Sequence, residues 1–419
     1  MTVLHRESDL MKLYLYCVGR TEVPLEWHQW CCLSLAAACL ADRVWYQKFG
    51  HSKLHPNMYI FLVGGSGEGK GVAIDYCMQF APDELFVKYG STTSKNMIDI
   101  MSAPTPLVPE PQKIMLVQPE LADNIQAGSI ADQMVKFMTG AYTAGSKDFD
   151  EGTRKHGVHR IPKDYVINWL AGTTDLWLSE VVDLKAMMSG FFGRVAVAPG
   201  EYSYHPRDRV HDPTKFLPPD YDQVIEYLKD AFNNLMMIRG QFEMAPDAYA
   251  NEEDWYLTRP EPDEERMKPF WRREQDLILK IAMVLSACQS FDLIIKLPHL
   301  LRARDLVAQV RKRLPWVMTA AAGTEAMRRI RWVENFIKSR RGEWVRRAEL
   351  AQKARNAVNV RASELDMIID DLVAMELVDI EAKGKRTSWR YTWHQRPRQV
   401  EDLSEFVPDL GYVSETDLQ

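Results

Sequence analysis

The chain has 419 residues, of which 46 % are hydrophobic and 26 % are charged, ordinary values for a globular protein of about two to four domains. Its formal net charge of −6 excludes a chain that is basic throughout. The six cysteines form no C-x-x-C pair and no zinc-type spacing with histidine, so no metal site or disulfide scaffold is predicted. The most apolar run, residues 30–41, is shorter than the roughly 20 residues of a spanning helix. With no signal-peptide pattern either, we expect a cytoplasmic protein without membrane contact.

In the first half of the chain, the predicted elements alternate between strands and helices. Helices are expected at 24–41, 69–80 and 132–140 and from about residue 94, and strands at 43–47, 57–63, 85–87, 114–117, 165–171 and 195–198. Continuous apolar strands separated by helices are typical of a parallel sheet covered on both faces. The predicted fold class is therefore α/β with a parallel sheet core.

In the second half, helical periodicity dominates. Helices are predicted at 221–238, 263–290 and 298–322, after a connector rich in proline, histidine and aspartate. Residues 325–394 are expected to form three helices and a strand pair, which fits a winged helix-turn-helix. The resulting division is a helical N-terminal segment (1–45), a core (46–200), a helical lid or connector (201–322), a winged-helix-like domain (323–395) and an acidic tail (396–419).

The net charge is unevenly distributed. Residues 321–400 hold 17 Lys and Arg against 11 Asp and Glu, whereas residues 401–419 hold six acids and no base. A basic module is thus masked by an acidic tail of equal and opposite charge, a pattern that suggests an interaction tail. The whole-chain value therefore does not exclude a nucleic-acid partner.

A glycine-rich motif joins the predicted strand 57–63 to the helix 69–80. The stretch Gly64-Gly65-Ser66-Gly67-Glu68-Gly69-Lys70 matches G-x-x-x-x-G-K, the pattern of a phosphate loop. Backbone N–H groups, the helix N-terminus and the lysine charge would together bind phosphate, so we predict ATP as ligand; the alternative is a plain glycine turn. Gly71 stands where a Ser or Thr normally binds Mg²⁺, so Mg²⁺ would be held through the nucleotide.

Three further positions are candidates for catalysis. Glu120 follows the apolar strand 114–117, where it could activate water, although Pro119 replaces the usual metal-binding Asp. Thr173 and Thr174 end the strand 165–171 and could sense the γ-phosphate or cap the next helix. Arg194, at the start of the strand 195–198, could reach the nucleotide of a neighbouring subunit or be a plain surface arginine.

In this order, the elements resemble a family of phage, plasmid and mobile-element P-loop proteins related to replicative helicases and to the helicase part of primase–helicases. The resemblance covers roughly residues 20–320 and rests on short segments at 57–64, 114–120, 153–157, 170–174, 190–194 and 279–282. It implies an AAA+/RecA-like ATPase of the additional-strand class that works as a ring, with a hexamer favoured. Lys70, Glu120 and Thr173/Thr174 would then act in cis and Arg194 in trans.

The resemblance also implies a DNA-binding hairpin between residues 145 and 161. Its candidate DNA contacts are Lys147, Arg154, Lys155, His156 and Arg160, which would bind the phosphates of single-stranded DNA; the alternative is a solvated loop. Arg272, Arg273 and Lys280, on the predicted helix 263–290, are candidates for a second sensor of the nucleotide. Of these, Arg273 and Lys280 are seven residues apart and so share a face.

The C-terminal module does not predict sequence-specific DNA binding. Its third helix (362–375) is acidic, and its bases lie on the second helix and the wing, so backbone contact and protein docking are both open. The acidic tail is either solvated and disordered, a competitor of DNA, or a docking segment for a replication partner.

The function favoured by these features is an ATP-dependent oligomeric DNA translocase or helicase that serves replication of a phage or mobile element. One alternative is a non-hydrolysing, nucleotide-switched initiator or helicase loader, which Gly71 and Pro119 favour. The other is a DNA-binding regulator in which an ATPase core controls oligomerisation.

Overall fold

The structure is a computed structural model. It describes residues 9–18, 21, 23–48, 52–102, 113–121, 129–143, 149–153, 157–161, 165–174, 190–200, 220–321, 329–330, 332–334, 336–337, 340, 343–374, 378–383 and 386–391. Within these ranges, no helix combines the length and the apolar character needed to cross a membrane.

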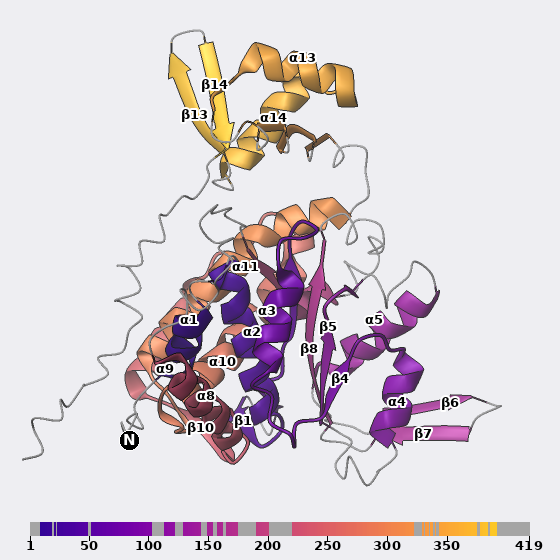
Figure 1. The fold of residues 1–419 in the computed structure, drawn as a ribbon, viewed down its shortest axis with the longest axis vertical. Coiled ribbons are helices and arrows are strands. Elements are labelled where there is room, and N and C mark those ends of the chain that lie inside the picture. The colour runs from indigo at the N-terminus through magenta and orange to yellow at the C-terminus, as the bar shows by residue number, and fades with distance from the viewer. Residues whose placement is uncertain are drawn as a thin grey trace, which may run out of the picture.

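A five-stranded parallel sheet forms the centre of the larger domain (Figure 1). Its order is β4-β5-β8-β3-β9, with β3 (Tyr59–Val63), β4 (Val87–Tyr89), β5 (Lys113–Gln118), β8 (Val166–Thr173) and β9 (Val195–Pro199). All of β3 and β8 is buried, as expected of parallel strands that are covered on both faces. Because β8 lies between β3 and β5, the sheet has the additional strand that the family resemblance implied.

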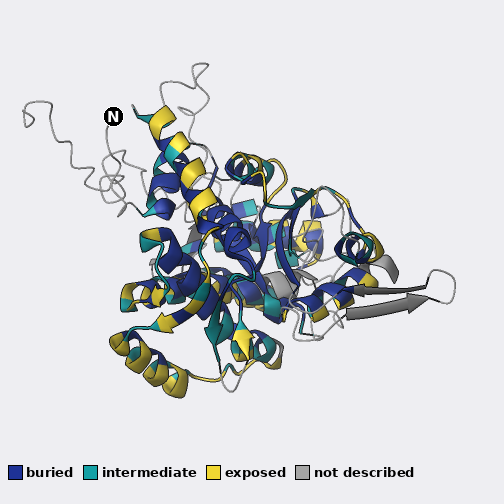
Figure 2. Cartoon of the chain, turned by 90° about the horizontal axis from the view of Figure 1, so that it is seen from below, coloured by how far each residue is buried: buried dark blue, intermediate teal, exposed yellow. Residues whose placement is uncertain are grey.

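Helices cover both faces of this sheet. Helix α2 (Leu25–Leu40) contacts β3, β8 and β9 and is apolar on nearly all sides, because α1 (Leu10–Val18), α3 (Lys70–Met78), α8 (Tyr221–Leu235) and α10 (Lys268–Ser290) surround it. The burial colours of Figure 2 show the same continuous interior. On the other face lie α4 (Ser94–Ser102) and α5 (Ser129–Ala141) (Figure 1). One hydrophobic core thus runs from Leu10 to Leu314, across the predicted segment boundaries.

A second sheet, which the sequence analysis did not predict, joins distant parts of the chain. Its order is β11-β10-β1-β2, with β1 (Val44–Gln47), β2 (Lys53–Leu54), β10 (Gly240–Met244) and β11 (Ile294–Ile295). Strand β10 pairs in parallel with β1, so the region expected to be a helical connector contributes to a sheet with the N-terminal part. Of β10, only Phe242 is buried, which is why its sequence carries little strand signal.

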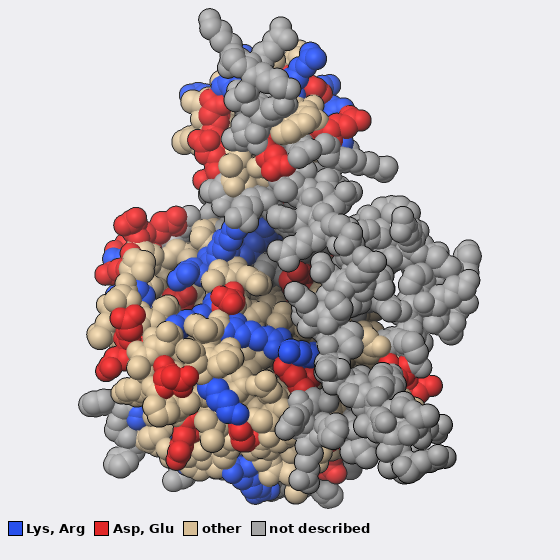
Figure 3. Space-filling model, turned by 90° about the vertical axis from the view of Figure 1, so that its left-hand side faces the viewer, with Lys and Arg blue, Asp and Glu red and all other residues tan. Residues whose placement is uncertain are grey.

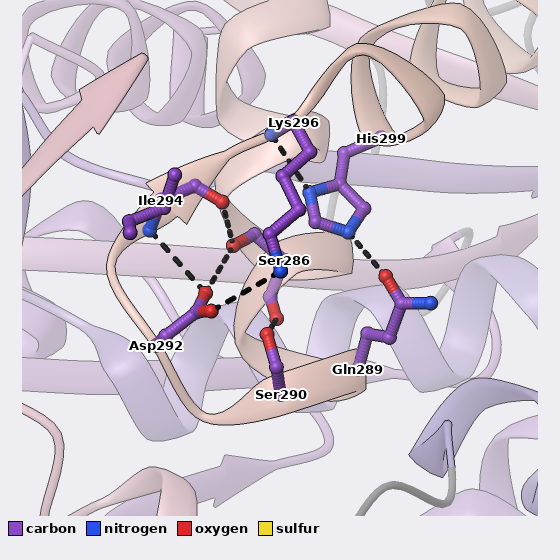
Figure 4. A network of polar contacts seen from close by, with 7 residues as sticks. All are labelled: Ser286, Gln289, Ser290, Asp292, Ile294, Lys296 and His299. Atoms are coloured by element: carbon purple, nitrogen blue, oxygen red, sulfur yellow. Dashed lines mark hydrogen bonds and ion pairs between the residues drawn. The ribbon is translucent and has the colours of Figure 1, made fainter. Parts of the chain in front are cut away.

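Three more helical elements belong to the larger domain: α9 (Pro246–Thr258), η5 (Glu265–Met267) and α11 (Leu297–Ala321). Helix α11 packs on α10, α9 and β9, and η5 packs on α10. A polar network fixes the turn between α10 and α11 (Figure 4). Ser286 donates to the carbonyl oxygen of Ile294 at 2.7 Å and to Asp292 at 3.2 Å, and Asp292 also accepts from the Ile294 amide. At the start of α11, His299 accepts from the Lys296 amide and contacts Gln289. The network thereby anchors β11 beside β10.

Two antiparallel strands lie between β5 and β8 in the sequence. They are β6 (Phe149–Thr153) and β7 (Gly157–Ile161), paired so that Thr153 faces Gly157. Strand β7 packs against α4, and Ile161 is fully buried. The strand pair matches the hairpin that the resemblance implied at this place.

A smaller domain follows with its own hydrophobic core, built from residues between Val333 and Val378. It contains a short strand β12 (Val345–Arg346), helices α13 (Arg347–Val358) and α14 (Ala362–Ala374), and the antiparallel strands β13 (Val378–Lys383) and β14 (Arg386–Tyr391). The second helix predicted for this domain is expected to begin at Val345. In the structure it begins two residues later, at Arg347, because Val345 and Arg346 pair with β14. The predicted tip of the wing, Gly384 and Lys385, lies outside the described residues.

Candidate nucleotide-binding site

The glycine-rich motif forms a loop at the carboxyl end of β3. The strand ends at Val63, and α3 begins at Lys70 after Gly69, whose φ of 91° is in the left-handed region that favours glycine. The N-terminus of α3 therefore faces the loop, an arrangement that favours anions. Lys70 is only 4 % exposed, and its Nζ donates to the carbonyl oxygens of Gly64, at 3.0 Å, and Gly65. The loop amides, helix end and lysine together have the donor set that a triphosphate requires.

Two side chains pack on the loop beside Gly64. Trp27 of α2 is fully buried against it, 2.6 Å from where an added Cβ on Gly64 would lie. Its ring centroid lies 5.6 Å from Lys70 Nζ, within cation–π range. Glu68 turns back onto the loop and accepts a hydrogen bond of 2.6 Å from the Gly65 amide.

The other candidate residues that lie at the carboxyl ends of the parallel strands are next to this loop. We call this end of the sheet its carboxyl edge and the opposite end its amino edge. Gly172 of β8 packs so closely on Pro119 that an added Cβ would collide with the Pro119 carbonyl oxygen and lie 3.5 Å from Lys70 Cβ. The Gly64 amide donates to the Thr173 carbonyl oxygen at 3.3 Å, while the Thr173 side chain is buried. Glu120 follows Pro119 and is exposed to solvent. The fold therefore brings Lys70, Thr173 and the Pro119–Glu120 pair to one edge of the sheet.

The residues of this site fit phosphate better than they fit Mg²⁺, which needs oxygen ligands. Gly71 carries no hydroxyl, and a Cβ added there would have no heavy atom within 4 Å. Throughout the described residues, no three His, Cys, Asp or Glu side chains gather as a metal site. An ion at this loop would therefore be held mainly through phosphate oxygens.

Arg194 lies at the opposite edge of the sheet. It immediately precedes β9, whose first residue pairs with Tyr59 at the start of β3. The two edges are separated by the length of β3 and its flanking residues, roughly 20 Å at about 3.3 Å per residue. Arg194 donates to the Gly190 carbonyl oxygen at 2.6 Å, and its buried Nε has no partner among the described residues. Burial and the nearby Arg273 cation lower its pKa.

The second-sensor candidates Arg273 and Lys280 also lie at this amino edge, on α10, whereas Arg272 is exposed on the same helix. Arg273 is half-buried, and it is close enough to both Arg194 and Lys280 to lower their pKa values. Lys280 is 2 % exposed, and its Nζ donates to the backbone oxygen and Oδ1 of Asn57 at 2.7 and 2.8 Å. The structure thus places Arg273 and Lys280 with Arg194, not with the phosphate loop.

Asn57 connects three elements at this edge. Its Nδ2 donates to the carbonyl oxygens of Tyr142, at 3.0 Å, and Ile167, at 3.5 Å, while both of its oxygens accept from Lys280. The Lys280 ammonium also lies 4.0 Å from the centroid of the Tyr142 ring. Residues following α5, the start of β8 and the middle of α10 are therefore held together by one buried amide. Asn57 is not among the residues predicted from the sequence, although a polar residue just before an apolar strand is a signal of a role at the strand end.

The buried Lys280 makes stability depend on pH. Burial lowers its pKa from 10.5 to about 7; Arg273, Arg194 and Lys48 add to this shift, and Asp276 opposes it. Between about pH 7 and 10 the unfolded chain binds a proton that the folded chain lacks, so stability rises with pH in this window. In urea unfolding at pH 7 and 9, the stability of the wild type minus that of Lys280→Met should increase by up to about 1.4 kcal/mol per pH unit. Replacing the exposed Lys95 with Met should give no such slope, and a constant Lys280→Met difference would contradict the prediction.

Most candidate DNA contacts fall outside the described residues. These are Lys147, Arg154, Lys155 and His156, whereas Arg160 lies on β7 opposite Asp150, with only its backbone described. On the face shown in Figure 3, Lys and Arg side chains form short runs with acidic side chains between and around them. DNA binding by the hairpin therefore stays a prediction.

Several bases of the smaller domain are paired with acids. Arg347 makes a bidentate contact with Asp366 at 2.6 and 2.8 Å, Arg329 contacts Glu364 at 2.8 Å, and Arg340 contacts Glu349 at 2.6 Å. The acidic α14 thus neutralises neighbouring arginines, one of them on α13. These arginines are less available for DNA phosphates than their number in the sequence suggests.

Taken together, the structure is an α/β core with a phosphate-binding type of loop at the carboxyl edge of a parallel sheet. Comparison with models of protein families finds no match, and no curated protein matches the chain. Among solved structures, the chain is similar to a full-length MCM homolog from Methanopyrus kandleri, with a TM-score of 0.40 and 14 % identity over 74 % of this chain. The match spans 59 % of that homolog's length.

Proposed function

We propose that this protein is an ATP-dependent DNA translocase or helicase that works as a homo-oligomeric ring. The observation that carries the proposal is the separation of two groups of charged residues on one sheet. Lys70 and Glu120 lie at its carboxyl edge, whereas Arg194 and Arg273 lie near its amino edge. An arginine roughly 20 Å from its own phosphate loop does not reach a nucleotide bound there, so a role for it in ATP turnover requires the nucleotide of a neighbouring subunit.

Each residue would have a distinct task. Lys70 and the loop amides bind the phosphates, Glu120 orients and polarises water, and Thr173 or Thr174 senses the γ-phosphate through a hydrogen bond. Arg194 of the adjacent subunit supplies positive charge where negative charge develops, and Arg273 supports it. Mg²⁺ bound to the triphosphate would neutralise part of its charge.

The DNA part of the proposal rests on the β6–β7 hairpin and the family resemblance. The predicted bases of the hairpin would hold single-stranded DNA through its phosphates, which makes binding independent of sequence and sensitive to salt. On the basis of the same resemblance, we propose that the protein serves replication of a phage or mobile element and forms a hexamer. The acidic tail would then serve contact with a replication partner.

ATP turnover measured with Mg²⁺, in the presence and absence of single-stranded DNA, tests this function. A translocase should show turnover that rises with DNA and falls as salt weakens DNA binding. Particle images with an ATP analogue and DNA should show a ring. Binding of ATP without turnover under all these conditions would support a nucleotide-switched initiator or loader instead.

That second function is favoured by one specific observation, the absence of a hydroxyl at Gly71. The space beside Gly71 is open, so Gly71→Ser introduces a possible Mg²⁺ ligand without a steric clash. We expect Gly71→Ser to raise Mg²⁺-dependent ATP turnover by about tenfold. Gly71→Ala is the matched control, because it adds the Cβ without the oxygen and should leave turnover near the wild-type value. Equal effects of Ser and Ala would show that a metal ligand is not what this position lacks.

A DNA-binding regulator is less well supported. Arg347 of α13 is held by Asp366, and the helix α14, which would be the recognition helix, is acidic. Specific readout of the major groove depends on basic or polar side chains that reach the bases. Protection of one defined DNA site in footprinting would nevertheless favour this function over a translocase.

A further inference from the structure

Glu68 is a half-buried acid whose carboxylate folds back onto the phosphate loop. Its Oε2 accepts the Gly65 amide at 2.6 Å. The Glu68 carboxylate oxygens also lie 2.7 Å from the positions that a Cβ would take on Gly64 and on Gly65. The carboxylate therefore covers the backbone of both glycines.

A phosphate loop binds anions because its amides and the helix N-terminus present partial positive charge. A carboxylate is itself an anion, and a hydrogen bond between a carboxylate and an amide is stronger than one between neutral groups. Without nucleotide, Glu68 therefore satisfies one of the loop donors. The Lys70 ammonium is likewise directed to the loop, where it donates to the carbonyl oxygens of Gly64 and Gly65.

From this geometry we infer that Glu68 competes with the phosphates of the nucleotide for the loop and sets its affinity. The inference rests on the proposed nucleotide binding and adds the residue that opposes it. A triphosphate entering the loop repels the Glu68 carboxylate and takes the Gly65 amide only after the carboxylate leaves. Affinity is consequently lower than the loop, the helix end and Lys70 would provide without this acid.

Affinities of Glu68→Ala and Glu68→Gln for ATP test the inference. Glu68→Ala should bind ATP about tenfold more tightly than the wild type, because it removes the competing anion. Glu68→Gln should fall between the two, since an amide oxygen still accepts a hydrogen bond but carries no charge. Glu84→Gln removes one charge from an exposed position outside the loop and should leave affinity unchanged.

Tripolyphosphate is a second probe, because it carries the phosphates without base or ribose. If Glu68 competes at the loop, Glu68→Ala should strengthen tripolyphosphate and ATP binding by similar factors. Unchanged or weaker binding of both probes by Glu68→Ala would overturn the inference and indicate that Glu68 only braces the loop. If neither the wild type nor any Glu68 variant binds either probe, the proposed nucleotide binding itself fails.

Discussion

Replacing Lys70 with alanine is expected to abolish nucleotide binding and all DNA-stimulated ATP turnover. Lys70 is the cation of the phosphate loop, and its Nζ already lies beside the oxygens of Gly64 and Gly65. Removing it leaves the triphosphate without the point charge of a buried ammonium. We expect the affinity for ATP to fall by about 100-fold or more. Titration calorimetry with a non-hydrolysable ATP analogue measures this loss directly.

A change in stability could mimic this loss, so folding has to be followed as well. Two hydrogen bonds of Lys70 disappear in the variant, which costs roughly 1–3 kcal/mol of unfolding free energy. Lys95→Ala, at an exposed position on α4, is the control for removing a lysine far from the loop. Wild-type affinity in a folded Lys70→Ala protein would show that the glycine-rich motif is only a turn.

The carboxyl edge of the site could be predicted because its signals are local in sequence. An apolar strand, a glycine-rich loop and a helix follow one another without interruption, so β3, the loop and α3 come from one stretch of chain. The apolar runs of β5, β8 and β9 likewise predict buried parallel strands. Pro119–Glu120 and Thr173 then meet the loop, because parallel strands end at the same edge.

The amino edge could not be predicted, because it depends on how distant elements cross. The predicted common face of Arg273 and Lys280 agrees with their placement, but it leaves open which end of the sheet that face meets. Only the packing of α10 against η2 (Phe192–Arg194) and α2 decides this, and it places Lys280 on Asn57, 223 residues earlier. The pairing of β10 with β1 is equally non-local. The sequence of β10 has little apolar pattern from which a strand could be predicted.

The amino edge also holds the arginines that we propose to act at a subunit interface. Arg194 and Arg273 carry like charges close together, and Arg194 has a buried Nε without a partner in the described part of the chain. Burying a cation among cations is unfavourable unless an anion compensates. The phosphates bound by the next subunit would supply that anion, so ring assembly and nucleotide binding should strengthen one another.

Arg194→Ala is therefore expected to lose ATP turnover while it keeps the ability to bind ATP. A trans-acting arginine contributes about 10³-fold or more to turnover by stabilising transition-state charge. The glycine-rich loop, where we propose that the nucleotide binds, lies at the other edge and stays intact. Turnover and ATP affinity, measured on the same preparation, separate these two effects. A parallel loss of ATP affinity in the isolated subunit would place Arg194 in its own site and contradict action in trans.

Mixing two inactive variants gives the sharpest form of this test. Lys70→Ala subunits retain Arg194, and Arg194→Ala subunits retain Lys70, so a mixed ring contains interfaces at which both residues are intact. An equimolar mixture should recover part of the wild-type turnover, whereas each variant alone stays inactive. Lys95→Ala, which changes an exposed lysine on α4, should behave as the wild type in all these assays. Failure of the mixture to recover turnover, with mixed particles demonstrated, would mean that the two edges do not complete one another across subunits.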